Sequence, residues 1–139
     1  MRRAFAVPAL VIGALVVAGA TVWAFAQMPG GIEEFNQAQA SADRVGLGSD
    51  VLGILPESVR LLAIDDGTKY FAARSDNEGL CLMLVPDGED TITAAACGGG
   101  DFVGSTAPGG SLVHLFETGM GDMEREGWRQ LSPNLYVEE

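Results

Sequence analysis

The sequence contains few of the side chains from which metal and catalytic sites are usually built. Its 139 residues include two cysteines and one histidine. A zinc site needs three or four such ligands, and the Gly-x-Ser-x-Gly motif of one large hydrolase class occurs nowhere in the chain. The sequence therefore predicts no metal, no cofactor and no catalytic residue, and it favours a non-catalytic protein.

Basic residues are also scarce. The chain has 8 basic and 19 acidic residues and a formal net charge of −11. Nucleic-acid binding depends on neutralising phosphates with lysine and arginine, and adhesion to anionic lipid headgroups needs the same sign of charge. The composition argues against nucleic acid as a partner and favours a soluble, acidic surface.

Charge is missing altogether from residues 4–26, which directly follow Arg2 and Arg3. As a helix this run would reach roughly 34 Å at about 1.5 Å per residue, which exceeds the ~30 Å hydrocarbon core of a bilayer. Arginines next to a membrane span stay on the cytoplasmic side. Residues 1–26 are therefore predicted to be a single-pass anchor in the cell membrane, with the rest of the chain extracytoplasmic.

A second interpretation of this segment is a cleaved export signal. Ala24-Phe25-Ala26 has the small-x-small pattern that precedes a cleavage site, so cleavage after Ala26 would release a secreted protein. The adjacent Arg2 and Arg3 are also compatible with a twin-arginine signal. All these interpretations place the remaining chain outside the cytoplasm.

The chain after the apolar run divides into two predicted parts. Residues 27–55 predict a tether, with a possible short helix over 32–44 whose apolar stripe is thin. Residues 56–139 predict a mainly β domain, a small antiparallel sheet or barrel-like fold, because short apolar runs alternate with glycine, aspartate and proline. The expected strands are residues 59–64, 69–74, 80–85, 91–97, 111–116 and 134–137.

The first two predicted strands are joined by Asp66-Gly67. This dipeptide between apolar runs predicts a two-residue hairpin turn, because both turn positions need a positive φ. In the simplest antiparallel register, Asp65 then lies opposite Thr68 and Leu62 opposite Phe71. Leu62 and Phe71 would share one face of the sheet.

The two cysteines, Cys81 and Cys97, flank the loop of a second predicted hairpin. If Asp87 lies opposite Thr91, the register places the cysteines opposite each other on one apolar face, and the hairpin is buried on both sides. Two cysteines in a small exported domain most simply pair. The spacing excludes a Cys-x-x-Cys redox site, and the sequence predicts one structural disulfide.

Two loops offer weaker signals of ligand binding. The acidic stretch of Asp87, Glu89 and Asp90 lacks the spaced oxygen ligands of a calcium loop and is more typical of a solvated turn. The glycine-rich residues 98–104 are not followed by the helix that a phosphate-binding loop requires.

His114 and Trp128 are further candidates for a functional role. His114 shares a predicted strand face with Leu112 and Phe116, which favours a partly buried or rim position over catalysis. Trp128, beside residues 124–126, is compatible with a recognition patch because tryptophan and arginine are enriched at binding hot spots. A single tryptophan in a small domain is more typical of the core.

A set of short motifs runs through residues 56–104: Pro56, residues 58–63 (SVRLLA), Tyr70-Phe71, residues 79–82 (GLCL) and residues 95–97 (AAC). In these motifs the segment resembles small exported domains that are found widely in bacteria. These motifs are structural, so the resemblance implies a small exported domain and no activity.

The function predicted from these features is a non-catalytic, extracytoplasmic, membrane-tethered module with an interaction or structural role. Its expected contacts are the lipid bilayer, through residues 4–26, and an envelope protein or other envelope component. The alternative is an envelope enzyme in which carboxylates, for example those of Asp65 and Asp87, converge in a cleft.

Overall fold

The computed structural model describes residues 31–47, 51–118 and 127–139. The predicted anchor and the predicted cleavage site lie outside these ranges. Within the described ranges, none of the helices has the length and hydropathy needed to cross a bilayer.

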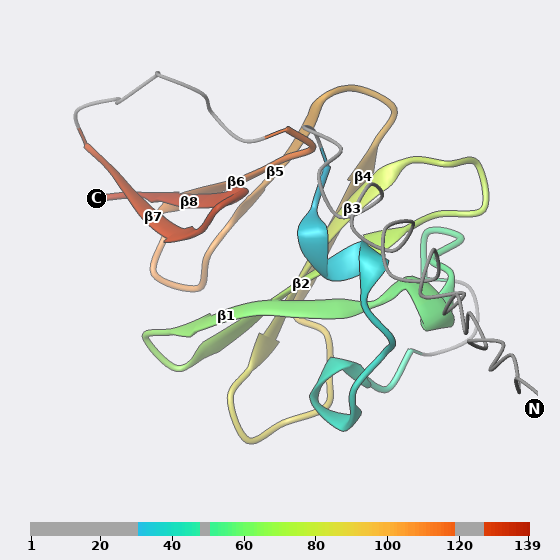
Figure 1. Ribbon diagram of the computed structural model, residues 1–139. Helices are drawn as coiled ribbons and strands as arrows, with labels where there is room; N and C mark the ends of the chain where they lie inside the picture. The colour runs from blue at the N-terminus through green and yellow to red at the C-terminus, as the bar shows by residue number, and fades with distance from the viewer. Residues whose placement is uncertain (1–30, 48–50, 119–126) are drawn as a thin grey trace, which may run out of the picture.

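The described residues form eight strands in two antiparallel sheets (Figure 1). The mainly β class predicted from the sequence is therefore confirmed. The first sheet has the order β1-β2-β3-β4, with β1 at Arg60–Asp65, β2 at Thr68–Arg74, β3 at Leu80–Pro86 and β4 at Ala94–Gly98. The second sheet has the order β5-β6-β8-β7, with β5 at Phe102–Thr106, β6 at Leu112–Phe116, β7 at Trp128–Ser132 and β8 at Leu135–Glu138.

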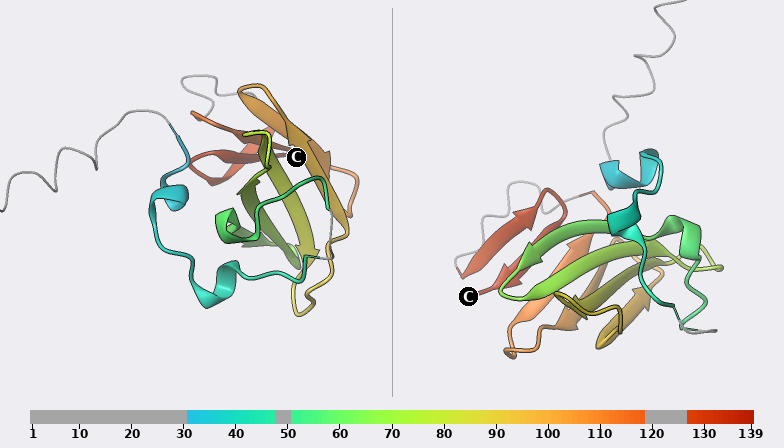
Figure 2. Two further views of the ribbon diagram at one scale, coloured as in Figure 1. Left: turned by 90° about the vertical axis from the view of Figure 1, so that its right-hand side faces the viewer. Right: turned by 90° about the horizontal axis from the view of Figure 1, so that it is seen from below.

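The two sheets pack face to face, and they also meet along both edges (Figure 2). At one edge β4 contacts β5, and at the other β1 contacts β7. The core cluster between the sheets draws side chains from both: Ile32, Tyr70, Ala72, Leu80, Leu82, Leu84, Val103, Val113, Leu115, Leu135 and Val137.

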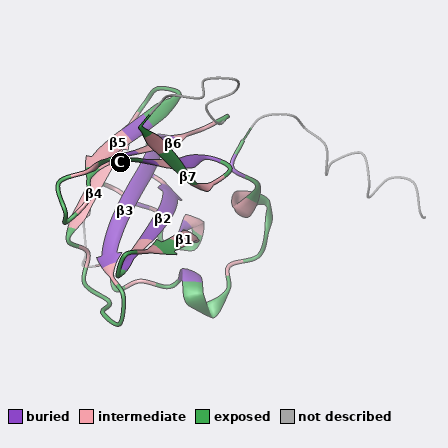
Figure 3. Cartoon of the chain, turned by 90° about the vertical axis from the view of Figure 1, so that its left-hand side faces the viewer, coloured by how far each residue is buried: buried purple, intermediate pink, exposed green. Residues whose placement is uncertain are grey.

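A second core cluster lies on the other face of the first sheet. It contains Ile54, Val59, Phe71, Ala73, Cys81, Met83 and Val85. Strand β3 is apolar at successive positions, so its side chains enter both clusters in alternation, and Figure 3 shows β2 and β3 as largely buried. The predicted burial of both faces is confirmed for β3, whereas β4 is half-buried.

The N-terminal segment packs on the sheets. The helix predicted over residues 32–44 is wrong, because two 3-10 helices, η1 (Glu33–Asn36) and η2 (Ser41–Asp43), stand in its place. Ile32 is only 2 % exposed in the inter-sheet core. The buried guanidinium of Arg60 donates to the carbonyls of Glu34 and Gln37 at 3.1 and 2.8 Å.

These contacts extend the folded unit into residues that the sequence assigned to a tether. The Asp43 carboxylate accepts hydrogen bonds from the backbone N–H groups of Ala40 and Leu61, at 2.6 and 2.8 Å. A third short helix, η3 (Pro56–Ser58), then leads into β1. Because the local helix signal was weak, long-range contacts of this kind decide the conformation.

The first hairpin has the predicted turn but a different register beyond it. Asp66 and Gly67 have φ values of 45° and 71°, and Asp65 pairs with Thr68. The predicted pairing of Leu62 with Phe71 is wrong, because a register shift between residues 61 and 63 pairs Leu61 with Phe71 instead. This β-bulge leaves Leu62 as an extra residue, and it packs against the inter-sheet cluster.

Two strands were not predicted. Strand β5 contains a glycine at its centre, and β7 (WRQLS) mixes polar and apolar residues without clear alternation. The strand predicted from residue 91 begins only at Ala94. Just before it, the N–H of Thr93 donates to the Leu84 carbonyl at 2.9 Å.

Candidate functional site

The outer face of the second sheet carries a group of aromatic side chains. Along β6, Val113 and Leu115 point into the inter-sheet core, so the residues that alternate with them point outward. The strand registers extend this outward set across the sheet. We call the resulting surface the aromatic face, and it comprises Phe102, His114, Phe116, Trp128 and Tyr136.

The rings of the aromatic face form one continuous network. Phe102 stacks on its cross-strand partner Phe116 with ring centroids 5.7 Å apart, and His114 lies 4.7 Å from Trp128. Tyr136 meets Phe116 edge-on at 5.9 Å. Stacked and edge-on pairs at these separations are favourable, so the rings hold one another in place on the sheet.

A glycine makes room for the centre of this network. Gly104 pairs with His114 across β5 and β6. A Cβ atom at Gly104 would lie 3.0 Å from Cδ2 of the imidazole, closer than side chains normally approach. Because Gly104 has no side chain, the His114 imidazole can pack against the backbone of β5, where it contacts the rings of Phe102 and Trp128.

The aromatic face is partly accessible to solvent, since Phe102 is exposed and its other four rings are half-buried. Phe102 is 52 % exposed, and the neighbouring Leu112 on the same face is 42 % exposed. Neither core cluster includes any ring of the face. The core position predicted for Trp128 is therefore wrong, whereas the partly buried position predicted for His114 is confirmed. Residues 124–126, which the sequence grouped with Trp128, lie outside the described residues.

An acidic cleft adjoins the aromatic face at one end of the sheets. It has a volume of about 230 Å³ and lies between the β1–β2 turn, the β5–β6 turn and the end of β8. Four carboxylates line it: Asp65, Asp66, Glu138 and Glu139. Glu138 connects the two surfaces, because it also lies opposite Trp128 in the β7–β8 pair.

One cation, Arg129, lies among these carboxylates. Its guanidinium donates to both oxygens of Asp65, at 3.1 and 2.9 Å, and its Nε lies 2.9 Å from a Glu139 oxygen. The hydrogen bonds from Arg129 lower the pKa of Asp65. Burial raises the pKa of the Tyr70 phenol, and the nearby charge of Asp65 raises it further. The residues that line the cleft therefore carry a net negative charge, because they include one arginine and four acidic residues.

The structure does not bring Asp65 and Asp87 into one cleft. The Asp87 N–H donates to the Gly67 carbonyl at 2.8 Å, so the two loops are adjacent, but Asp87 is not among the residues that line the cleft of Asp65. In the described ranges, no group of three or more histidine, cysteine, aspartate or glutamate side chains is placed to hold a metal ion.

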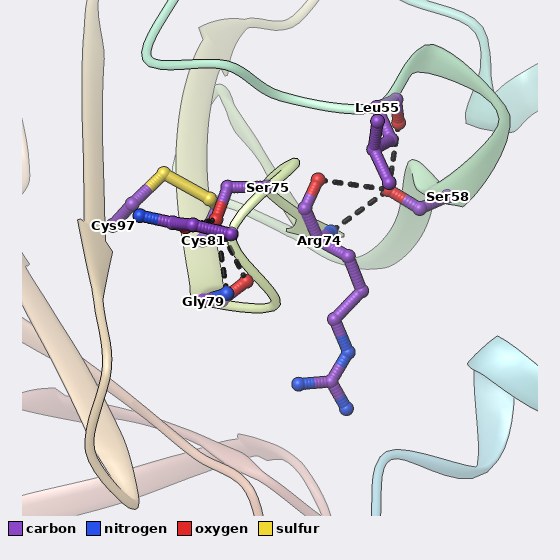
Figure 4. The surroundings of a disulfide bond; sticks show 8 residues. Leu55, Ser58, Arg74, Ser75, Gly79, Cys81 and Cys97 are labelled. Atoms are coloured by element: carbon purple, nitrogen blue, oxygen red, sulfur yellow. Dashed lines mark hydrogen bonds between the residues drawn. A yellow bond between two sulfur atoms is a disulfide. The ribbon is translucent and has the colours of Figure 1, made fainter.

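The disulfide lies in the first sheet. Cys81 and Cys97 are directly paired across β3 and β4, with Cα atoms 4.1 Å apart, and Figure 4 shows the bond between the strands. The predicted pairing is confirmed, and Met83 pairs with Ala95 on the same face. Ile92, which precedes the paired part of β4, packs with this cluster as well.

The strand end next to the disulfide is fixed by hydroxyl groups. The Ser75 hydroxyl accepts a hydrogen bond from the Gly79 N–H at 3.0 Å in the β2–β3 turn. The Ser58 hydroxyl donates to the Leu55 carbonyl and accepts from the Arg74 N–H, at 2.6 and 2.8 Å (Figure 4). These hydrogen bonds and the disulfide connect neighbouring segments of the first sheet, so we interpret this part of the sheet as structural.

No family model, curated protein or solved structure matches the chain.

Proposed function

We propose that this protein is a non-catalytic, membrane-tethered module that binds an envelope partner through the aromatic face. The observation that carries the proposal is a connected set of rings on the outside of a sheet whose inner face alone supplies the core. Contiguous exposed apolar surface marks interaction sites, and tryptophan and tyrosine are enriched among the residues that dominate binding energy.

The location of this module outside the cytoplasm rests on two features. Disulfides persist in oxidising compartments, and the Cys81–Cys97 bond is consistent with export. The uncharged residues 4–26 provide the anchor. N-terminal sequencing of the native protein distinguishes the retained anchor from cleavage after Ala26, because cleavage gives a chain that starts at Gln27.

A retained anchor would hold the domain near the bilayer. Ile32 is already part of the inter-sheet core, so only residues 27–31 separate it from the apolar run. At no more than about 3.6 Å per residue, this linker reaches about 18 Å. The partner of the aromatic face would therefore be a membrane protein or another component at the membrane surface.

Site-specific photo-crosslinking in intact cells tests the proposal. A photoreactive residue is placed at position 102, on the aromatic face, or at position 64, on the first sheet; the native side chains are 52 % and 54 % exposed. We expect position 102 to crosslink to a discrete envelope component and position 64 to give none. Absence of a crosslink at position 102, or the same product from both positions, would contradict the proposal.

The enzyme alternative has less support in the geometry. A carboxylate pair that acts as acid and base needs pKa values shifted in opposite directions. Asp65 is held ionised by Arg129, and the carboxylate proposed as its partner, Asp87, does not line the same cleft. The acidic cleft is better suited to binding a cation.

A further inference from the structure

We infer that the partner presents a basic polypeptide segment, whose arginines stack on the aromatic face while a neighbouring cationic group enters the acidic cleft. This inference rests on the proposed function and specifies the chemistry of the partner. It depends on three observations: the charge around the aromatic face, the position of Glu138 between the two surfaces, and an arginine site within the domain that has the same composition.

The charge around the aromatic face favours a cationic partner. Among the described basic residues, Arg129 directly follows Trp128 in β7, and it is paired with Asp65 and Glu139. Arg60 is buried and bonded to backbone carbonyls, and Arg74 is paired with Glu117. Glu138 lies opposite Trp128 in the β7–β8 pair, and the chain carries a formal net charge of −11. This charge attracts cations and repels a second copy of the acidic chain.

Glu138 lies where the aromatic face meets the acidic cleft. It lies directly opposite Trp128 in the β7–β8 pair, it is exposed, and it is one of the residues that line the cleft. Directly opposed residues have Cβ atoms about 4.5–5.5 Å apart, so the Trp128 ring and the Glu138 carboxylate can contact the same ligand group. One extended segment can therefore contact the rings and the carboxylates together.

The domain already contains an arginine held by the same combination of groups. The Arg74 guanidinium lies 4.7 Å from the centroid of the Phe35 ring and pairs with the Glu117 carboxylate. A planar guanidinium stacks on an aromatic face and forms paired hydrogen bonds with a carboxylate, which an ammonium group does less well. The Trp128–Glu138 pair offers an incoming arginine the same two partners.

The test uses the full chain in neutral detergent with a Trp23→Phe substitution, which leaves Trp128 as the single tryptophan of the original two. Its fluorescence is followed during titration with tetra-arginine, with tetra-lysine of equal charge, and with the neutral sugar chitotetraose. We expect tetra-arginine to bind about fivefold more tightly than tetra-lysine, and its affinity to fall with added salt. No response to tetra-arginine, equal affinity for the two peptides, or binding of the sugar alone would overturn the inference.

Three variants locate the binding on the surface. Phe102→Ala should reduce the preference for arginine over lysine at least twofold, because it removes a stacking ring. Glu138→Gln should weaken both peptides and lower the salt dependence. Ile64→Ala, on the first sheet, is the matched control and should leave both affinities unchanged. Peptide binding that is indifferent to Phe102→Ala and Glu138→Gln would show attraction to the acidic surface in general, and would overturn the inference.

This experiment can fail without the proposed function failing. A crosslink from position 102 together with no peptide response would show that the aromatic face binds a partner of different chemistry. Loss of the crosslink together with no peptide response would remove both proposals.

Discussion

The two sheets of this domain differ in what their outer faces do. The inner strands of the first sheet, β2 and β3, are largely buried on both faces. A second core cluster covers their outer side, and it includes the disulfide and side chains from residues 45–47 and 51–59. The second sheet is buried on its inner face and presents connected aromatic rings on its outer face. Apolar side chains on β2 and β3 therefore contribute to stability, whereas those on the outer face of the second sheet are available for binding.

The largest difference should come from truncating one side chain of each kind. Leu82 of β3 is fully buried between the sheets, and Leu82→Ala should cost about 2–5 kcal/mol of unfolding free energy. Phe102→Ala, on the aromatic face, should cost about 1 kcal/mol or less, because the ring is half exposed. Denaturant unfolding of both variants measures the contrast, and equal losses would show that the aromatic face belongs to the core.

The second-largest effect on stability is expected from removal of the disulfide. Its cysteines are 16 residues apart, and a closed loop of that size stabilises by about 3 kcal/mol in the chain-entropy model. Replacing both cysteines with alanine should lower the melting temperature of the domain. Thiol labelling of the native protein under denaturing, non-reducing conditions is the direct check, and two labelled cysteines would contradict the pairing.

The first hairpin turn should give a smaller effect. Gly67 has a φ of 71° and open space around its Cα, so a side chain there is opposed by backbone conformation alone. Gly67→Val should destabilise the domain by about 1–3 kcal/mol. Gly109, in the β5–β6 turn, has similar space without a positive φ, and Gly109→Val is the matched control. An unchanged melting temperature for Gly67→Val would contradict the claim that the β1–β2 turn requires glycine at this position.

The smallest effect concerns the pairing of Asp65 with Arg129. The pKa of Asp65 is lowered in the folded state, so its contribution to stability is present above the unfolded pKa of about 3.9 and is lost as the pH falls through the lower folded value. Because solvent screens an exposed ion pair, we expect this to be the smallest of the effects. Asp65→Asn should flatten the acid limb of the stability profile more than Asp66→Asn, and identical profiles would contradict the assignment.

The hairpins could be predicted because their signals are local. Alternation around the acidic loop placed Cys81 opposite Cys97, and Asp66-Gly67 identified its own turn. The bulge at Leu62 could not be predicted in this way. Its apolar neighbours on both sides fit either face, so packing against two different clusters decides the register.

The aromatic face could not be predicted because it is assembled from distant segments. Phe102 and Trp128 lie on strands that the sequence did not indicate, and the strand order β5-β6-β8-β7 brings them to the same surface. Gly104 pairs with His114, and this pairing explains how the imidazole can pack flat against β5. The pairing depends on the β5–β6 register, which the sequence did not predict. One signal was available, since His114 and Phe116 were correctly placed on one strand face.

The most direct test of the central claim compares partner recovery with stability for Phe102→Ala and its control Ile64→Ala. Each variant is treated in intact cells with a chemical crosslinker that needs no probe at position 102 or 64, and is then purified. The amount of the envelope component that is captured by the native protein is measured for each variant, and the melting temperatures are compared. The expected result is that Phe102→Ala loses the partner while it melts close to the native protein, and that Ile64→Ala retains both. Full recovery of the partner by Phe102→Ala would contradict the assignment of binding to the aromatic face.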